Sequence, residues 1–240
     1  MKIDLCLSPA LFKYHDVQKE TVVIVVDIFR ATTTICRAFS NGAVAIIPLA
    51  SIEEAEAMKQ YGYLVGAERN VAKCDFADFG NSPFEYSRDK VEGNTIAFTS
   101  TNGTQAIEVA EGVDTLLIGA FSNISTVADF CLKKQQDVLI VCAGWHNKMN
   151  LEDSLFAGAL AEQLLNSGKC SANSDTVEMS LGLWKAAKVD LHLYLSKSEH
   201  VQRLLSHGLE KDIAYCLEMN TVNVLPIYDK KSKSLVIENL

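Results

Sequence analysis

Residues that could do chemistry follow a buried-strand pattern in the stretch VVIVVDIFRATTTI, which runs from Val22 to Ile35. A β-branched run bounded by charge predicts a strand that is covered on both faces. Ligands in open α/β sheets bind beyond the carboxyl ends of such strands. We therefore expect Asp27 at this rim as a metal ligand or nucleophile, and Arg30 as an anion-binding group. The alternative is an ordinary helix cap with a local ion pair.

Two further segments place polar groups after predicted strands or turns. In GAERN, Glu68 and Arg69 follow a short strand that ends in glycine, so an acid and a base again lie at a sheet edge. In FGNSP, Ser82 could cap a short helix that begins at Pro83, which would leave the Asn81 side chain available to a ligand. Taken alone, an exposed ion pair explains the first segment and a plain turn explains the second.

The segment FTSTNGTQA joins a predicted strand to a predicted helix through a turn rich in hydroxyl groups. Gly103 would let backbone N–H groups converge on an oxyanion, and the positive end of the helix favours phosphate there. Thr101, Asn102 and Thr104 would add side-chain donors. The segment lacks the glycine and lysine pattern of a P-loop, and a simple helix cap is the alternative.

The segment CAGWHNKMNLEDSLFAG contains the last pair of acids that could bind a metal ion. A strand that ends at Cys142 turns and re-enters a helix with Glu152 and Asp153 in its first turn. Adjacent carboxylates are hard oxygen ligands that suit Mg²⁺. In the alternative, Asn150 caps the helix and both acids only complement the helix dipole.

The elements that must position these groups alternate between short β-branched runs and helical periodicity up to about residue 166, which predicts an α/β fold. The predicted strands are Ile3 to Leu7, Val22 to Val26, Ala43 to Pro48, Tyr63 to Val65, Thr95 to Phe98, Thr115 to Ile118 and Val138 to Cys142. The predicted helices are Thr33 to Ser40, Ile52 to Tyr61, Thr104 to Glu111, Ile124 to Lys134 and Leu151 to Asn166.

The pattern changes after residue 170. Helices are predicted from Thr176 to Ala187 and from Glu199 to Met219, followed by a hairpin of Val222 to Tyr228 and Ser234 to Ile237. We expect a single domain over residues 1–240, with a C-terminal subdomain from about 170 left open because no linker marks it. The apolar stripes of the late helices would serve equally as core or as the interface of a homodimer.

The composition and net charge of the chain limit the classes of function that it could have. The chain has 240 residues, of which 48% are hydrophobic, and a formal net charge of −8. This charge argues against nucleic-acid binding and against adhesion to an anionic membrane, but not against an anionic substrate that is held locally. The seven cysteines include no C-x-x-C pair, and no signal peptide is recognisable, so we expect a cytoplasmic protein.

Taken together, VDIFRATTT, GAERN, FGNSP, TNGT, CAG and EDSLFAG resemble the motifs of the 2-phosphosulfolactate phosphatase (ComB-type) family. The resemblance implies a three-layer α/β/α fold with a mostly parallel or mixed sheet, and a Mg²⁺-dependent phosphomonoesterase. It also implies the family reaction, hydrolysis of 2-phosphosulfolactate to sulfolactate and phosphate in coenzyme M biosynthesis. The chain differs from the family in the loop after GAERN, where a glycine-rich continuation is replaced by VAKCDFADFG.

With this resemblance, Asp27, Glu68, Glu152 and Asp153 become the expected Mg²⁺ ligands, and Asp27, Arg30 and Glu68 the expected catalytic residues. The expected substrate-binding residues are Arg69, Asn81, Ser82, Thr101, Asn102, Gly103, Thr104 and Cys142. The expected partner is a small anionic phosphorylated substrate. An activated water is the expected nucleophile, with an aspartyl-phosphate on Asp27 left open. The alternative function is a non-catalytic protein that binds a phosphorylated or sulfonated metabolite.

Overall fold

The computed structural model describes residues 1–172 and 174–238. Its strands are β1 Lys2–Cys6, β2 Val22–Val26, β3 Ala45–Pro48, β4 Leu64–Arg69, β5 Ala72–Lys73, β6 Thr95–Thr99, β7 Thr115–Gly119, β8 Val138–Cys142, β9 Ser171–Ala172, β10 Pro226–Asp229 and β11 Ser234–Ile237. Its helices are α1 Ala31–Ser40, α2 Ile52–Gln60, α3 Arg88–Val91, α4 Gly103–Ala110, α5 Ile124–Lys134, α6 Leu151–Asn166, α7 Asp175–Ala187, α8 Leu191–Leu195, α9 Glu199–Ser206 and α10 Glu210–Cys216, with 3₁₀ turns η1 Pro9–Tyr14, η2 Pro83–Glu85 and η3 Phe121–Asn123.

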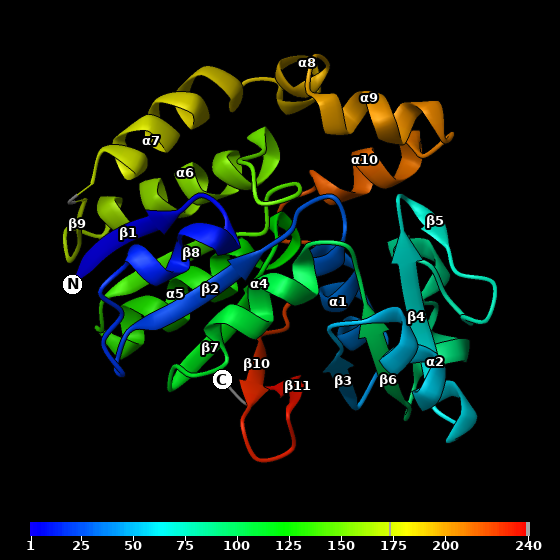
Figure 1. The fold of residues 1–240 in the computed structure, drawn as a ribbon. Helices are drawn as coiled ribbons and strands as arrows, with labels where there is room; N and C mark the ends of the chain where they lie inside the picture. The colour runs from blue at the N-terminus through cyan, green and yellow to red at the C-terminus, as the bar shows by residue number, and fades with distance from the viewer. Residues whose placement is uncertain (173, 239–240) are drawn as a thin grey trace.

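The strands form one mixed, mostly parallel sheet in the order β5-β4-β6-β3-β11-β10-β7-β2-β8-β1-β9. Strand β2 pairs in parallel with β7 and β8, and β6 pairs in parallel with β3 and β4. The C-terminal hairpin lies between these two parallel groups and is antiparallel to both (Figure 1). Ile227 pairs with Leu117 on one side, and Leu235 pairs with Ile46 on the other. The end of the chain therefore joins the two halves of the sheet.

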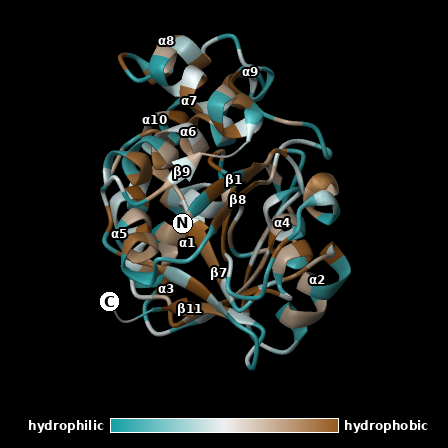
Figure 2. Cartoon of the chain, turned by 90° about the vertical axis from the view of Figure 1, so that its left-hand side faces the viewer, coloured by the Kyte–Doolittle hydropathy of each residue, from teal (hydrophilic) through white to brown (hydrophobic). Residues whose placement is uncertain are grey.

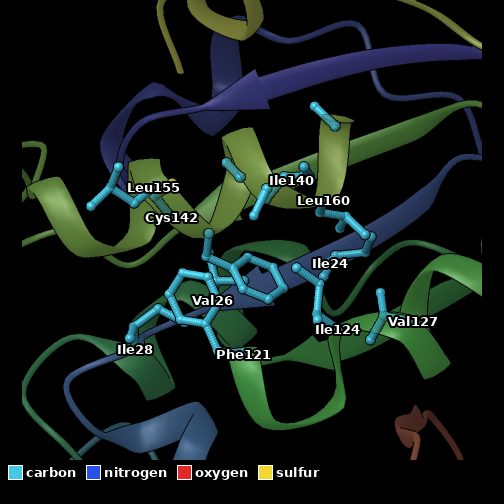
Figure 3. Packing of buried hydrophobic residues seen from close by; sticks show 14 of the residues in the cluster. Ile24, Val26, Ile28, Phe121, Ile124, Val127, Ile140, Cys142, Leu155 and Leu160 are labelled. Atoms are coloured by element: carbon cyan, nitrogen blue, oxygen red, sulfur yellow. The ribbon is translucent and has the colours of Figure 1, made fainter. Parts of the chain in front are cut away.

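Helices cover both faces of the sheet, so the expected α/β class is confirmed. Alternate residues of β2 supply the two cores: Val22, Ile24 and Val26 belong to the core that α5, α6 and α7 cover, and Val23 and Val25 to the core that α1 and α4 cover. Figure 2 shows the apolar residues gathered along the strands, and Figure 3 shows the first core, where Ile24 and Val26 lie among side chains of α5 and α6. A parallel strand with two covered faces needs such a continuous apolar run.

Several predicted elements match the structure residue for residue, among them β2, β8, α5 and α6. The single helix predicted from Glu199 to Met219 is wrong, because the structure has α9 and α10 in its place. Gly208 separates them with a positive φ of 69°, a conformation that ends a helix and favours glycine. Helices α8, α9 and α10 lie across the end of the sheet where β2 and β4 end (Figure 1).

Among the residues that the structure describes, no helix combines the length and the apolar character that a bilayer span requires.

The position of the hairpin gives a stability prediction. Leu235 of β11 is fully buried, whereas Ile237 of the same strand is 36% exposed. We expect Leu235→Ala to lower the free energy of unfolding by about 2–5 kcal/mol, because it leaves a cavity where the two halves of the sheet meet. Ile237→Ala is the matched control and should cost less than about 1 kcal/mol. Urea unfolding measures both, and equal losses would contradict this role of the hairpin.

Candidate active site

Asp27 stands directly after β2, in a turn that its own neighbours hold together. The Asp27 backbone N–H donates to Thr32 Oγ1 at 3.0 Å, and that hydroxyl donates to the Asp27 carbonyl at 2.9 Å. Thr33 Oγ1 donates to the Ile28 carbonyl and Thr34 Oγ1 to the Asn81 carbonyl. All three threonines are buried. Their hydroxyls therefore donate within and around the turn that presents Asp27 and hold its shape.

Arg30 reaches the same region through a buried ion pair. Its Nη1 donates to Asp212 Oδ2 at 2.6 Å, and its Nη2 donates to the Val71 carbonyl at 3.3 Å. Ser82 Oγ donates to the other oxygen of Asp212 at 3.0 Å. Asp212 belongs to α10, so a helix near the end of the chain fixes the guanidinium. Ser82 acts on the site through Asp212.

The start of α4 packs against Asp27. A Cβ at Gly103 would lie 2.8 Å from Asp27 Oδ2 and 2.7 Å from the Ala31 Cβ, so only glycine allows this approach. Ser100 Oγ accepts a hydrogen bond from the Thr104 N–H at 3.3 Å, and Thr104 Oγ1 donates to the Ser100 carbonyl at 3.1 Å. The start of α4 thus lies against the Asp27 carboxylate. That backbone N–H groups at Gly103 bind an oxyanion stays a prediction.

Glu68, in β4, is held by three donors. Its Oε1 accepts hydrogen bonds from the Val71 N–H at 2.9 Å and from Thr101 Oγ1 at 3.1 Å, and its Oε2 accepts one from Asn81 Nδ2 at 3.4 Å. Arg69 makes different contacts, since it donates to the Glu68 carbonyl and to Thr99 Oγ1. Glu68 is thus bonded to two predicted substrate-binding residues, Asn81 and Thr101, whereas Arg69 supports the end of β4.

Asp153 ties three elements together with one carboxylate. Its Oδ1 accepts a hydrogen bond from the Ile28 N–H at 2.9 Å and its Oδ2 one from the Gly144 N–H at 3.1 Å. The first amide follows β2, the second follows β8, and Asp153 lies in the first turn of α6. Asn150 caps this helix by accepting from the Asp153 N–H. Asn150 therefore caps α6, and the Asp153 carboxylate joins the start of this helix to the ends of β2 and β8.

Glu152 is fully buried and pairs with a histidine that the sequence did not predict. Glu152 Oε1 lies 2.6 Å from His200 Nδ1, and Glu152 Oε2 has no hydrogen-bond partner among the described residues. His200 belongs to α9. Its ring packs edge-on against Phe29 and tilted against Trp145, with centroids 5.8 and 5.6 Å apart.

Asp27, Arg30 and Glu68 line one small cavity, which we call the reaction cavity. The other residues that line it are Phe29, Val71, Asn81, Ser100, Thr101, Asn102, Trp145, His200 and Leu204. Its volume is about 10 Å³, which is the space of one water.

A larger pocket adjoins the reaction cavity, and we call it the side pocket. Trp145 and His200 line both spaces. The side pocket has a volume of about 480 Å³, which is within the usual range for small-molecule sites. Its other lining residues are Lys148, Met149, Asn150, Leu151, Glu152, Lys197, Ser198, Glu199 and Arg203.

The electrostatics of the site are dominated by buried acids. Burial raises the pKa of Asp27 to about 6, with His200 lowering it and the charges of Glu68 and Glu152 raising it further. Burial also raises the pKa of Asp153 well above its usual value, and the charges of Asp27 and Glu152 add to that effect. Several carboxylates thus compete for ionisation in one desolvated region, and a cation would relieve this repulsion.

The donor set suits a magnesium ion in a limited way. Among the described residues, no three His, Cys, Asp or Glu side chains lie close enough to hold one ion together. Mg²⁺ usually needs only one or two carboxylates, because water and substrate phosphate oxygens fill its other positions. Asp27 and Glu68 share the reaction cavity and fit this mode. Glu152 and Asp153 do not line this cavity, so these two fit it less well.

The structure places Cys142 away from the reaction cavity. Its side chain is fully buried in the first core, close to Val26 and Leu155 (Figure 3). Burial raises the pKa of its thiol well above the usual value, so the thiolate is disfavoured. The structure does not support the prediction that Cys142 binds substrate. Cys142 is a core residue at the end of β8, and the chain reaches the site only after this strand.

Sequence reasoning missed His200, Asp212 and Trp145. Both His200 and Asp212 lie in a segment with apolar residues at helical spacing, which predicts core and gives no sign of a site. Their partners Glu152 and Arg30 are 48 and 182 residues away in the chain. The sequence offers only a weak indication for Trp145, which directly follows the CAG motif at the end of a predicted strand.

Comparison with known proteins identifies related sequences over nearly the whole chain. Residues 6–231 match the family model described as 2-phosphosulpholactate phosphatase. A protein of Thermotoga petrophila is 37% identical over 224 residues, which cover 93% of this chain and 94% of that protein. Proteins of Clostridium acetobutylicum and Carboxydothermus hydrogenoformans are 34% and 36% identical, with coverage of 95% and 100% of this chain and 97% and 98% of theirs. Each of the three is named a probable 2-phosphosulfolactate phosphatase.

The raised pKa of Asp27 predicts how stability changes with pH. As the pH rises from 3.8 through about 6, the unfolded chain exposes a carboxylate that the folded protein must bury, so stability is lost over this window. In metal-free protein at pH 7.5, Asp27→Asn should raise the free energy of unfolding by about 1–3 kcal/mol, and the gain should vanish near pH 4. Asp129→Asn, at an exposed position in α5, is the control. Urea unfolding across this pH range is the measurement, and a gain that does not depend on pH would contradict it.

The two amide contacts of Asp153 predict a loss when one oxygen is replaced. Asp153→Asn sets an NH₂ group against an N–H donor, so we expect a loss of about 1–3 kcal/mol in the free energy of unfolding. The matched control is Asp190→Asn, because Asp190 caps α8 by accepting from the Leu193 N–H alone, a task that asparagine performs as well. Urea unfolding of both variants tests this prediction. Equal losses of unfolding free energy in the two variants would contradict the stabilising role of the two Asp153 hydrogen bonds.

Proposed function

The chain belongs to the 2-phosphosulpholactate phosphatase family, which makes it a phosphoric monoester hydrolase, and from this premise we propose that it hydrolyses 2-phosphosulfolactate to sulfolactate and phosphate with the help of Mg²⁺. The observation that carries the proposal is that Asp27 and Arg30, which follow β2, line one small cavity with Glu68 from the end of β4. A cavity with two acids, a fixed guanidinium and a helix N-terminus beside it has the groups that phosphoryl transfer requires.

The phosphoryl group is proposed to bind between Arg30 and the start of α4. Arg30 is held by Asp212, so its remaining N–H groups keep a fixed orientation toward the cavity that it lines. The absent side chain at Gly103 lets the first amides of α4 approach the same place. Asn102 lines the cavity too, and its Oδ1 accepts from the His146 N–H, which orients its NH₂ group.

Asp27 and Glu68 are the residues that would hold Mg²⁺. When bound, the ion would neutralise phosphate charge and lower the pKa of a coordinated water. The buried acids support this proposal, because burial raises the pKa of Asp27 and the charges of Glu68 and Glu152 raise it further, and a cation would offset both effects. Glu152 and Asp153, expected earlier as further ligands, are assigned other tasks in this proposal. Asp153 fixes the turn that carries Asp27, and Glu152 orients His200.

His200 is proposed to move a proton in the reaction. Its Nδ1 is paired with Glu152 Oε1, and its Nε2 has no hydrogen bond among the described residues, while the ring lines the reaction cavity. A histidine oriented by a carboxylate can hold a proton at its other nitrogen and pass it to a leaving oxygen. We propose water as the nucleophile, since Asp27 is assigned to the metal ion and the acid of the usual aspartate-phosphatase pair is absent at Phe29.

The setting of the protein is part of the same proposal. Hydrolysis of 2-phosphosulfolactate would place it in coenzyme M biosynthesis. All seven cysteines are free, which fits a reducing compartment such as the cytoplasm. The expected homodimer remains a prediction.

Phosphate release tests the proposed function. We expect the purified protein to release phosphate from 2-phosphosulfolactate, to lose this activity in EDTA and to regain it with added Mg²⁺. Asp27→Asn should lower kcat/KM by at least about 10³-fold in a folded protein, because it removes charge at the reacting group. Asp129→Asn should leave activity unchanged.

The other outcomes are equally informative. Activity that survives EDTA would reject the metal ion and keep the phosphatase. Tight binding of 2-phosphosulfolactate by folded protein without any turnover would replace the enzyme with the binding module that the sequence also allowed.

A further inference from the structure

The turn between β4 and β5 has a backbone conformation that does not suit one of its two residues. Asn70 and Val71 both have a positive φ, of 53° and 76°. They lie between Arg69 and Ala72, which pair with each other. Two positive φ angles are typical of a type I′ hairpin turn, whose second position favours glycine. Asparagine tolerates this region, but for a β-branched residue a positive φ is an outlier. The backbone is therefore strained at Val71.

The strained residue lies beside the reaction cavity. Val71 is among the residues that line it, and its backbone groups contact two of the charged groups there. The Val71 N–H donates to Glu68 Oε1 at 2.9 Å, and the Val71 carbonyl accepts from Arg30 Nη2 at 3.3 Å. One residue thus connects an acid proposed to hold Mg²⁺ with the guanidinium proposed to bind the phosphoryl group. Strain that persists at such a place indicates a functional constraint.

The side chain of Val71 keeps the turn in this conformation. Strand β5 has only two residues, both exposed, and it lies at the edge of the sheet (Figure 1). Asn70 is exposed as well. Val71, in contrast, is half-buried and packs against the first core. Of the two turn residues, only Val71 therefore has an apolar contact that offsets the strain.

We propose that Val71 is a positioning residue that holds Glu68 and Arg30 in a fixed relation to each other at the reaction cavity. This inference rests on the proposed function and adds to it the residue that fixes a metal ligand and the phosphoryl-binding group together. Arg30 is also paired with Asp212, so its planar guanidinium is held at two points and keeps one orientation. A small displacement of such groups costs more in rate than in substrate binding, because they must match the transition state.

Glycine at position 71 tests the proposal, because it keeps both backbone hydrogen-bonding groups, relieves the strain and removes the side chain that anchors the turn. In Val71→Gly we expect kcat for 2-phosphosulfolactate to fall by about 10- to 100-fold, with KM within about 3-fold of the wild type. The thermal midpoint should stay close to that of the wild type, since relief of strain offsets the lost packing. Val71→Ile keeps a branched apolar side chain and should retain kcat within about 3-fold.

Asn70→Gly is the matched control. It places glycine at the neighbouring position of the same turn, where φ is also positive and the residue is exposed. Its kcat should stay within about 2-fold of the wild type, because the anchor at Val71 remains. Equal losses of kcat in the two glycine variants would overturn the role of Val71. A fall of the thermal midpoint that accounts for the lost activity of Val71→Gly would overturn it too.

Amide hydrogen exchange supplies a readout that needs no turnover. The protection factor of the amide at residue 71 should fall by at least about 10-fold in Val71→Gly and stay unchanged in Asn70→Gly. Unchanged protection in both variants would overturn the proposal while leaving the phosphatase intact. If the wild-type protein does not hydrolyse 2-phosphosulfolactate, the proposed function fails, and hydrogen exchange alone then decides whether Val71 holds the turn.

Discussion

One carboxylate holds the parts of this site in register. Asp153 accepts the amide of Ile28, just beyond Asp27, and the amide of Gly144, in the turn that leads to Trp145. Without these two bonds, the ends of β2 and β8 would have buried amides with no partner, which is expensive inside a protein. The same residue brings the start of α6, and with it Glu152, next to the cavity. The position of Asp27 therefore depends on Asp153, which lies in the first turn of α6.

The C-terminal third completes what the strand ends begin. Asp212 orients Arg30, and His200 pairs with Glu152, so two helices from late in the chain supply the partners of residues from early motifs. The final hairpin lies in the middle of the sheet and links its two parallel halves. Because these contacts span most of the chain, we infer that the site forms only when the whole domain is folded.

The sequence predicted the parts that depend on local order and missed those that depend on distant pairing. The run before Asp27 predicted β2 because a strand covered on both faces must be apolar throughout. Asp27 and Glu68 were predicted at a common rim because polar residues directly follow such strands. His200 and Asp212 gave no signal, since a helix with an apolar stripe looks the same whether its polar face meets solvent or a site. Cys142 was predicted to bind substrate, but it is still the last residue of β8 and its side chain packs in the core.

Burial around the reaction cavity makes it costly to ionise the acids of the site. Asp27 and Asp153 are ionised only at a cost when the site is dry, and burial raises the pKa of both. A cation or the positive edge of a ligand would offset this cost, so binding free energy and folding free energy are linked at this point.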